Sequence, residues 1–212
     1  MLNQILSNKW TKVGVFALSL VPLLVIVVRL SLQRATANPA EYLQHATGDW
    51  TLRFLIFSLG ITPLRKILNL PDLIRFRRML GLFAFFYACL HFLTYIGPDQ
   101  SFDLGGMWRD VQKRRFITVG FAAFVLLIPL AITSTKGWIR RLGGKRWQRL
   151  HRLVYVAAAC GVIHYYWLVK SDVRKPVIYG VLVGILLLWR LRNGFLKRNR
   201  TLTPSAGTSS VA

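Results

Sequence analysis

The sequence predicts an all-α integral membrane protein, a bundle of six transmembrane helices. Three observations lead to this fold class. Hydrophobic residues make up 54% of the 212-residue chain, its mean hydropathy is +0.43, and long uncharged runs alternate with short basic segments. Because a bilayer offers the backbone no water to bind, apolar runs of this length are expected to be helices.

Six segments have the composition of membrane spans. The first covers residues 13–30, behind Lys9 and Lys12, and we favour an uncleaved helix over a signal peptide because the run is long for one. The second is the weakest, and it approaches the required ~20 residues only if it extends back from residue 50 towards Tyr42. The six predicted spans are 13–30, 50–64, 79–96, 116–133, 153–169 and 176–191.

Residues 1–200 therefore form one six-helix domain, and the small, polar tail 201–212 is expected to be a disordered cytoplasmic segment. The chain carries 29 Lys and Arg against 7 Asp and Glu, and most of this excess lies at the termini and after the second and fourth spans. The positive-inside rule then places both termini in the cytoplasm, with the protein in a bacterial inner membrane. A nucleic-acid-binding protein could share this charge but would not need such apolar runs, so no nucleic acid is expected.

Two of the four histidines lie deep inside predicted spans. His91 and His164 are each thirteen residues from the cytoplasmic start of the third and fifth spans, which run in the same direction. Both rings should therefore lie about 20 Å from the inner boundary. Two imidazoles at equal depth on neighbouring helices can bind one haem iron, although membrane histidines also serve as hydrogen-bonding groups between helices. Any haem would be held non-covalently, because no CxxCH motif is present and Cys89 and Cys160 lie in apolar spans.

The position of His151 leaves its role open. Residues 147–167 are expected to form one apolar helix with His151 and His164 at its ends, about 140° apart around the axis. His151 matches the depth of Arg78, with Arg77 beside it, and guanidinium groups do not serve as ordinary haem ligands. This inner region could hold a second haem with an unusual ligand, or an anionic cofactor such as a flavin phosphate bound by Arg77 and Arg78. His45 is expected in a solvated loop.

Several strings are similar to one known family. RRMLGLFAFFYACLHFLTY, LAITSTKGWIRRLGGKRWQRLHRLVY and VIHYYW resemble the MsrQ (YedZ) family, within the ferric-reductase-like transmembrane group, over about residues 10–195. The resemblance implies a b-type haem, with His91, His151 and His164 at the candidate ligand positions, and an FMN. It also implies electron transfer from the quinone pool or a cytoplasmic flavin reductase to the periplasmic molybdopterin enzyme MsrP, which reduces methionine sulfoxide in envelope proteins.

The sequence departs from the two-haem members of this group. It lacks the fourth ligand histidine, on the third span, and it carries no recognisable nucleotide-binding domain, so we do not expect this chain alone to oxidise NAD(P)H.

We expect an electron-transfer subunit that is not an enzyme by itself. Electrons would enter near the cytoplasmic face, pass the His151 region and reach a haem between His91 and His164. The outer segments 97–115 and 170–175 are the expected docking surfaces. Two alternatives stay open: a stand-alone transmembrane metal or oxygen reductase, and a non-redox membrane scaffold or transporter subunit.

Overall fold

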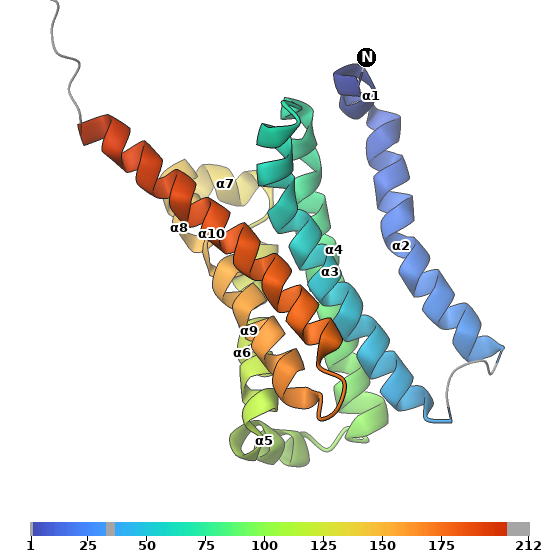
Figure 1. The fold of residues 1–212 in the computed structure, drawn as a ribbon. Coiled ribbons are helices and arrows are strands. Elements are labelled where there is room, and N and C mark those ends of the chain that lie inside the picture. The colour runs from blue at the N-terminus through green and yellow to red at the C-terminus, as the bar shows by residue number, and fades with distance from the viewer. Residues whose placement is uncertain (1, 33–36, 203–212) are drawn as a thin grey trace, which may run out of the picture.

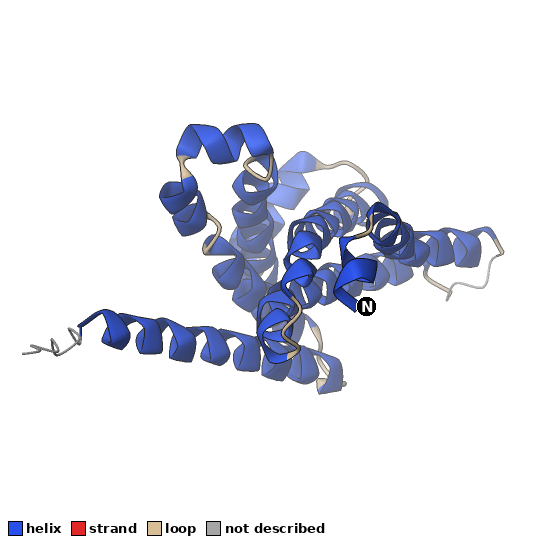
Figure 2. Ribbon diagram, turned by 90° about the horizontal axis from the view of Figure 1, so that it is seen from above, coloured by secondary structure: helices blue, strands red, loops and turns tan. Residues whose placement is uncertain are grey.

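The computed structural model describes residues 2–32 and 37–202, and all regular structure in these ranges is helical (Figures 1 and 2). The long helices are α2 (Lys9–Ser31), α3 (Pro39–Ile67), α4 (Ile74–Thr94), α6 (Arg115–Ile132), α9 (Leu153–Leu168) and α10 (Arg174–Leu202). The short elements are α1 (Leu2–Ser7), the 3-10 turn η1 (Pro71–Leu73), the π turn η2 (Tyr95–Asp99), α5 (Leu104–Lys113), α7 (Lys136–Leu142) and α8 (Gly144–Leu150).

The long helices form two tightly packed pairs. Helix α3 lies antiparallel against α4, and α6 against α9, as Figure 1 shows. Helix α10 crosses α9 and α3 at a slant, and α2 lies at the edge of the bundle. The end of the bundle that holds α5 lies opposite the end that holds α1, α7 and α8. This arrangement encloses a space between α3, α4, α6 and α9.

Four stretches of the described chain are long and apolar enough to cross a membrane, judged by length and composition. They are Lys9–Ser31, Pro71–Pro98, Arg115–Ile132 and Arg174–Gly194. Helix α9 falls short because it has 16 residues, and α3 because it carries several charged side chains. The protein is thus an all-helical, multi-pass membrane protein, and four of the six predicted spans meet this criterion.

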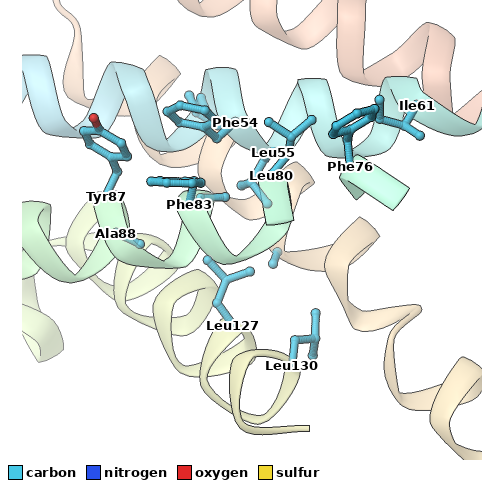
Figure 3. Packing of buried hydrophobic residues seen from close by; sticks show 13 residues of the cluster. Phe54, Leu55, Ile61, Phe76, Leu80, Phe83, Tyr87, Ala88, Leu127 and Leu130 are labelled. Atoms are coloured by element: carbon cyan, nitrogen blue, oxygen red, sulfur yellow. The ribbon is translucent and has the colours of Figure 1, made fainter. Parts of the chain in front are cut away.

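Aromatic side chains dominate the packing of α3 on α4. The ring of Phe54 stacks on those of Phe83 and Tyr87, with centroids 5.6 and 5.2 Å away, as the close view in Figure 3 shows. Tyr87 has no exposed surface. Such aromatic pairs contribute about 0.5–1.5 kcal/mol each beyond the area they bury. They fix the register of α3 against α4, the helix that carries His91.

Tyr87 also ties α2 to the bundle. Its hydroxyl donates to the Ser19 carbonyl (3.0 Å) and accepts from the Leu23 amide (3.0 Å). In a regular helix the Leu23 amide would donate directly to Ser19, four residues earlier. The tyrosine oxygen is therefore inserted into the hydrogen-bond ladder of α2, next to Pro22, where a proline already weakens that ladder.

Helix α3 begins earlier than the sequence predicted. The Asn38 side chain accepts a hydrogen bond from the Glu41 amide (3.2 Å), and Pro39 occupies the first turn. Both features stabilise a helix start at this point. His45 consequently lies within α3, and its prediction as a loop residue was wrong, although its side chain is 47% exposed.

The single helix predicted over residues 147–167 is also wrong. Helix α8 ends at Leu150, His151 and Arg152 form a turn, and α9 begins at Leu153. Two connections predicted as loops are largely helical: η2 and α5 occupy most of 97–115, and α7 and α8 occupy 136–150. Gly143, with φ of 72°, joins α7 to α8 in a left-handed conformation that glycine adopts without strain.

The first two residues of the predicted disordered tail are helical, so the prediction was wrong for them. Helix α10 continues through Thr201 to Leu202. The rest of the predicted tail, residues 203–212, lies outside the described residues.

Candidate functional site

The rings of His91 on α4 and His164 on α9 lie against each other in the bundle interior. Their centroids are 6.1 Å apart and their planes are inclined by 74°. Imidazole nitrogens bind first-row metals at about 2 Å, so two rings that bind one metal ion from opposite sides have centres about 6 Å apart. The spacing of His91 and His164 is that of a bis-imidazole pair.

In each ring, a hydrogen bond at Nδ1 determines which nitrogen carries the proton and which keeps a lone pair for a metal. His91 Nδ1 lies 3.0 Å from the Gln44 carbonyl oxygen, and His164 Nδ1 lies 2.7 Å from that of Phe116. A carbonyl oxygen only accepts, so Nδ1 carries the proton in both rings, and each Nε2 keeps its lone pair. Metal-binding histidines commonly hold their second nitrogen in this way, which fixes the tautomer and the ring orientation.

Two helical glycines leave room for these rings. A Cβ atom added at Gly120 on α6 would lie 2.6 Å from His164 Nδ1, and one added at Gly48 on α3 would lie 3.1 Å from His91 Cε1. A side chain at Gly120 would displace the ring. Sequence reasoning missed both glycines, although a glycine inside an apolar helical run suggests a close approach of this kind.

The pair lies in a cavity of about 470 Å³, which is within the usual range for small-molecule sites. Polar side chains, including Gln44, His45, Asp49 and Arg114, line part of it. The other lining residues are mostly apolar and include Leu52, Leu55, Phe92, Phe121, Phe124, Leu127 and Ala157.

These residues fit a haem. Two neutral imidazoles share an apolar cavity whose glycines leave space at both rings. Among the described residues no group of three or more His, Cys, Asp or Glu side chains is placed to hold a bare metal ion. A porphyrin would supply the four remaining iron ligands that the chain does not.

His151 does not join this pair, and lies at the opposite end of the bundle. Its Nε2 is 3.1 Å from the Thr133 hydroxyl, which itself donates to the Pro129 carbonyl (2.6 Å). The Trp147 ring stacks on it, with centroids 3.9 Å apart. Burial, and secondarily the Arg77 guanidinium, lower the pKa of His151, so the ring is neutral at pH 7. Because Thr133 already donates elsewhere, His151 Nε2 carries the proton, and only Nδ1 keeps a lone pair.

The two predicted arginines, Arg77 and Arg78, are adjacent on α4 but point in different directions. Arg77 is partly buried and interacts electrostatically with His151, whereas Arg78 is exposed. A second cation, Arg190 on α10, lies within electrostatic range of Arg77 and was missed by sequence reasoning. It donates to the Thr62 hydroxyl (2.7 Å) and to that of Tyr155. Among the described residues, neither Arg77 nor Arg190 forms an ion pair, which makes this inner cluster a candidate anion site.

A cluster of ion pairs around Asp49, which lines the cavity, was also missed. Asp49 Oδ2 on α3 lies 3.6 Å from Arg53 and 3.7 Å from Lys175, and the Asp49 side chain is only 13% exposed. The hydroxyl of Tyr165, the residue after His164, also interacts with Asp49. The pattern Asp-x-x-x-Arg in a predicted span would have signalled an intrahelical ion pair.

Most of the chain matches a known family and known relatives. Residues 13–162 match the family described as ferric reductase like transmembrane component. The chain is 59% identical over 175 residues to a protein of Herminiimonas arsenicoxydans, covering 82% of this chain and 80% of that protein. It is 49% identical over 194 residues to one of Rhodospirillum rubrum, covering 92% and 93%. Both relatives are named protein-methionine-sulfoxide reductase heme-binding subunit MsrQ.

Proposed function

Because the chain belongs to the MsrQ family of ferric reductase-like transmembrane components, we propose that it is the haem-binding membrane subunit of a protein-methionine-sulfoxide reductase. In this role it is a b-type cytochrome that passes electrons to a periplasmic molybdopterin reductase, MsrP, which repairs oxidised periplasmic proteins. The chain supplies no catalytic residue for the reduction of methionine sulfoxide.

The geometry of His91 and His164 carries this proposal. Their Nε2 atoms would bind the haem iron, while the carbonyls of Gln44 and Phe116 hold the rings through Nδ1. When bound, the haem supplies one-electron redox chemistry. The apolar side chains around it exclude water, and the hydrogen bonds to Nδ1 increase the basicity of the ligands and so influence the reduction potential.

The membrane arrangement follows from the packing. Helices α3 and α9 also cross the bilayer, because each packs along a neighbour that meets the criterion for a span. With six spans both termini lie on the same side, and the excess of Lys and Arg there supports the cytoplasm of a bacterium, so that α5 and residues 170–175 would lie on the periplasmic side. These outer segments are the proposed docking surfaces for MsrP.

The inner cluster is the proposed site of an anionic cofactor, FMN. Arg77 and Arg190 provide unpaired positive charge for a phosphate, and His151 lies beside them. A second bis-histidine haem is not supported, because among the described residues His151 has no histidine partner. The proposed electron donor is the quinone pool or a cytoplasmic flavin reductase.

The test is the visible spectrum of detergent-purified protein expressed with haem available. We expect the bands of a six-coordinate, low-spin b haem after reduction with dithionite. His91→Ala and His164→Ala should each abolish that spectrum, whereas Gly184→Ala, at a position with open space, should retain it. Full retention of low-spin haem with both ligands replaced contradicts the assignment, and colourless wild-type protein favours a non-redox scaffold.

A further inference from the structure

A second cavity lies between α2 and α3, beside the candidate haem site. It measures about 550 Å³ and lies in the part of the bundle near the outer end (Figure 1). Its α2 wall is mostly apolar and consists of Leu18, Val21, Pro22, Val25, Ile26 and Arg29. The opposite wall is mostly polar, with Tyr42, His45, Ala46, Asp49, Trp50 and Arg53 from α3 and Lys175 from α10. His45 and Asp49 line the haem cavity as well. We refer to this second cavity as the α2–α3 groove.

The α2–α3 groove carries an excess of positive charge. Its lining residues include three cations, Arg29, Arg53 and Lys175, and a single carboxylate, that of Asp49. Asp49 Oδ2 lies 3.6 Å from Arg53 and 3.7 Å from Lys175, so this carboxylate is already paired twice. Arg29 forms no ion pair with any residue that the structure describes. Because unbalanced charge inside a membrane bundle is costly, the groove favours an anionic ligand.

Arg29 lies at the depth of a lipid headgroup. It belongs to the last turn of α2, twenty residues after Lys9 at the start of the helix (29 minus 9). At a rise of about 1.5 Å per residue, the two residues are about 30 Å apart along the axis, which is the thickness of the hydrocarbon core. With Lys9 at one boundary of the bilayer, Arg29 lies at the other. Lys175, in the first turn of α10, extends to the same groove with a side chain that is 63% exposed.

The apolar part of the groove continues from Arg29 towards the centre of the bilayer. Leu18, Val21, Pro22 and Val25 recur at helical spacing, so they share one face of α2 with Arg29. This face extends about 16 Å from Arg29 to Leu18. Val21 and Val25 are 45% and 44% exposed. A ligand in the groove therefore meets cations at headgroup depth and hydrocarbon below them, which is the polarity of a phospholipid.

We propose that the α2–α3 groove is a binding site for an anionic phospholipid of the outer leaflet, such as phosphatidylglycerol. Its phosphate binds Arg29 and Lys175, its glycerol hydroxyls donate to Asp49, and its acyl chains lie along the apolar face of α2. Charge-assisted hydrogen bonds from Arg and Lys to phosphate are among the strongest in proteins. The lipid ties α2 to α3, in addition to the contact that Tyr87 makes with α2. This inference goes beyond the proposed function, because it needs neither a haem nor an electron donor.

The chemistry of the groove distinguishes this lipid from other ligands. A neutral ring with an apolar tail gains nothing from the excess of positive charge. A zwitterionic lipid such as phosphatidylethanolamine would bring its ammonium group to Asp49, where Arg53 and Lys175 already bind the carboxylate and would repel a third cation. A free phosphate ion would satisfy the cations but leave the apolar face of α2 uncovered. An anionic phospholipid satisfies both parts of the groove.

The first experiment is photolabelling of the purified full-length chain in detergent. The probe is phosphatidylglycerol with a diazirine group in one acyl chain, and mass spectrometry identifies the labelled peptides. We expect labels on α2 and α3 at the groove. Val25→Trp fills the groove and should abolish them, whereas Leu24→Trp should preserve them, because Leu24 is 62% exposed and does not line the groove. Labels elsewhere, or wild-type labelling of Val25→Trp, overturn the proposal.

Competition in the same assay identifies the ligand class. Unlabelled phosphatidylglycerol should displace the probe. Phosphatidylethanolamine with the same acyl chains, the soluble headgroup glycerophosphoglycerol and decylubiquinone should not displace it at the same concentration. Equal displacement by any of these three overturns the proposal, in favour of a zwitterionic lipid, a free phosphate ester or a neutral ring respectively.

The second experiment tests the cation at headgroup depth. Arg29→Gln should weaken phosphatidylglycerol binding about tenfold, as expected for the loss of one hydrogen bond to a charged group. Lys12→Gln, an exposed cation near the other end of α2, should match the wild type. Phosphatidylglycerol should also raise the midpoint of thermal unfolding of the wild type, because a ligand of the native state stabilises it, and should do so less in Arg29→Gln. Wild-type affinity in Arg29→Gln overturns the site. Both measurements need no haem, so a colourless protein that binds the lipid would contradict the haem assignment alone.

Discussion

His91 and His164 face each other across 6.1 Å although 73 positions separate them in the sequence (164 minus 91), and a backbone carbonyl fixes each ring through Nδ1. Neither carbonyl belongs to the helix that carries the ring it binds: Gln44 lies on α3 and Phe116 on α6. Four helices therefore position two imidazoles, and this makes the site sensitive to small changes on helices that carry no ligand.

Gly120→Ala should disrupt the ligand pair without removing a ligand. The new methyl group would lie 2.6 Å from His164 Nδ1, so the ring must move and its hydrogen bond to Phe116 must break. We expect loss of the low-spin haem spectrum, measured by absorbance and electron paramagnetic resonance. Gly184→Ala is the matched control, because that position has open space. An unchanged spectrum in Gly120→Ala would show that His164 is not held as described.

Tyr87→Phe should weaken the attachment of α2. The change removes the oxygen that satisfies both Ser19 and Leu23, and an unsatisfied buried polar group costs about 1–3 kcal/mol. We expect a lower midpoint of thermal unfolding in detergent. Tyr166→Phe, at a residue that is 49% exposed, should leave the midpoint unchanged. Equal midpoints for the two variants would contradict a structural role for the Tyr87 hydroxyl.

Arg77→Gln and Arg78→Gln should have different effects, although the residues are adjacent. Arg77 faces His151 and Arg190, whereas Arg78 is exposed. If the inner cluster binds a phosphate, Arg77→Gln should lower the FMN content per chain, determined by mass spectrometry, and Arg78→Gln should not. Both variants should keep the haem spectrum of the outer site. Equal FMN content in the wild type and Arg77→Gln would exclude this cluster as the flavin site.

The six-span arrangement can be tested by topology. Alkaline phosphatase fused after Ser101 or after Asp172 should be active in the periplasm, and fusions after Gly143 or at the C-terminus should be inactive. The fusion after Asp172 is decisive, because it reports whether α9, with 16 residues, crosses the membrane. Inactivity there would leave α9 as a buried helix that does not span.

Much of the architecture could be predicted from local sequence, because apolar length and basic flanks report directly on the bilayer. The limits of α6 and α9 differ from the predicted 116–133 and 153–169 by one residue at the most. Histidines at matching depths were a sound basis for pairing His91 with His164, since a rise of about 1.5 Å per residue converts position into depth. The turn at His151 could not be seen in this way, because helices α8 and α9 lie directly on either side of it and neither glycine nor proline marks the break.

The sequence by itself determined that this is a helical membrane protein, because hydropathy and charge act along the chain, and its motifs around His91, His151 and His164 carried the resemblance to the ferric-reductase-like group. Only the tertiary structure decided that Gly48 and Gly120 make room for the rings, that Arg77 faces inward and Arg78 outward, and that Asp49 lies between two cavities. These relations depend on how helices distant in sequence are rotated against one another. Rotation is set by the packing of side chains such as Phe54, Phe83 and Tyr87, which no single segment encodes.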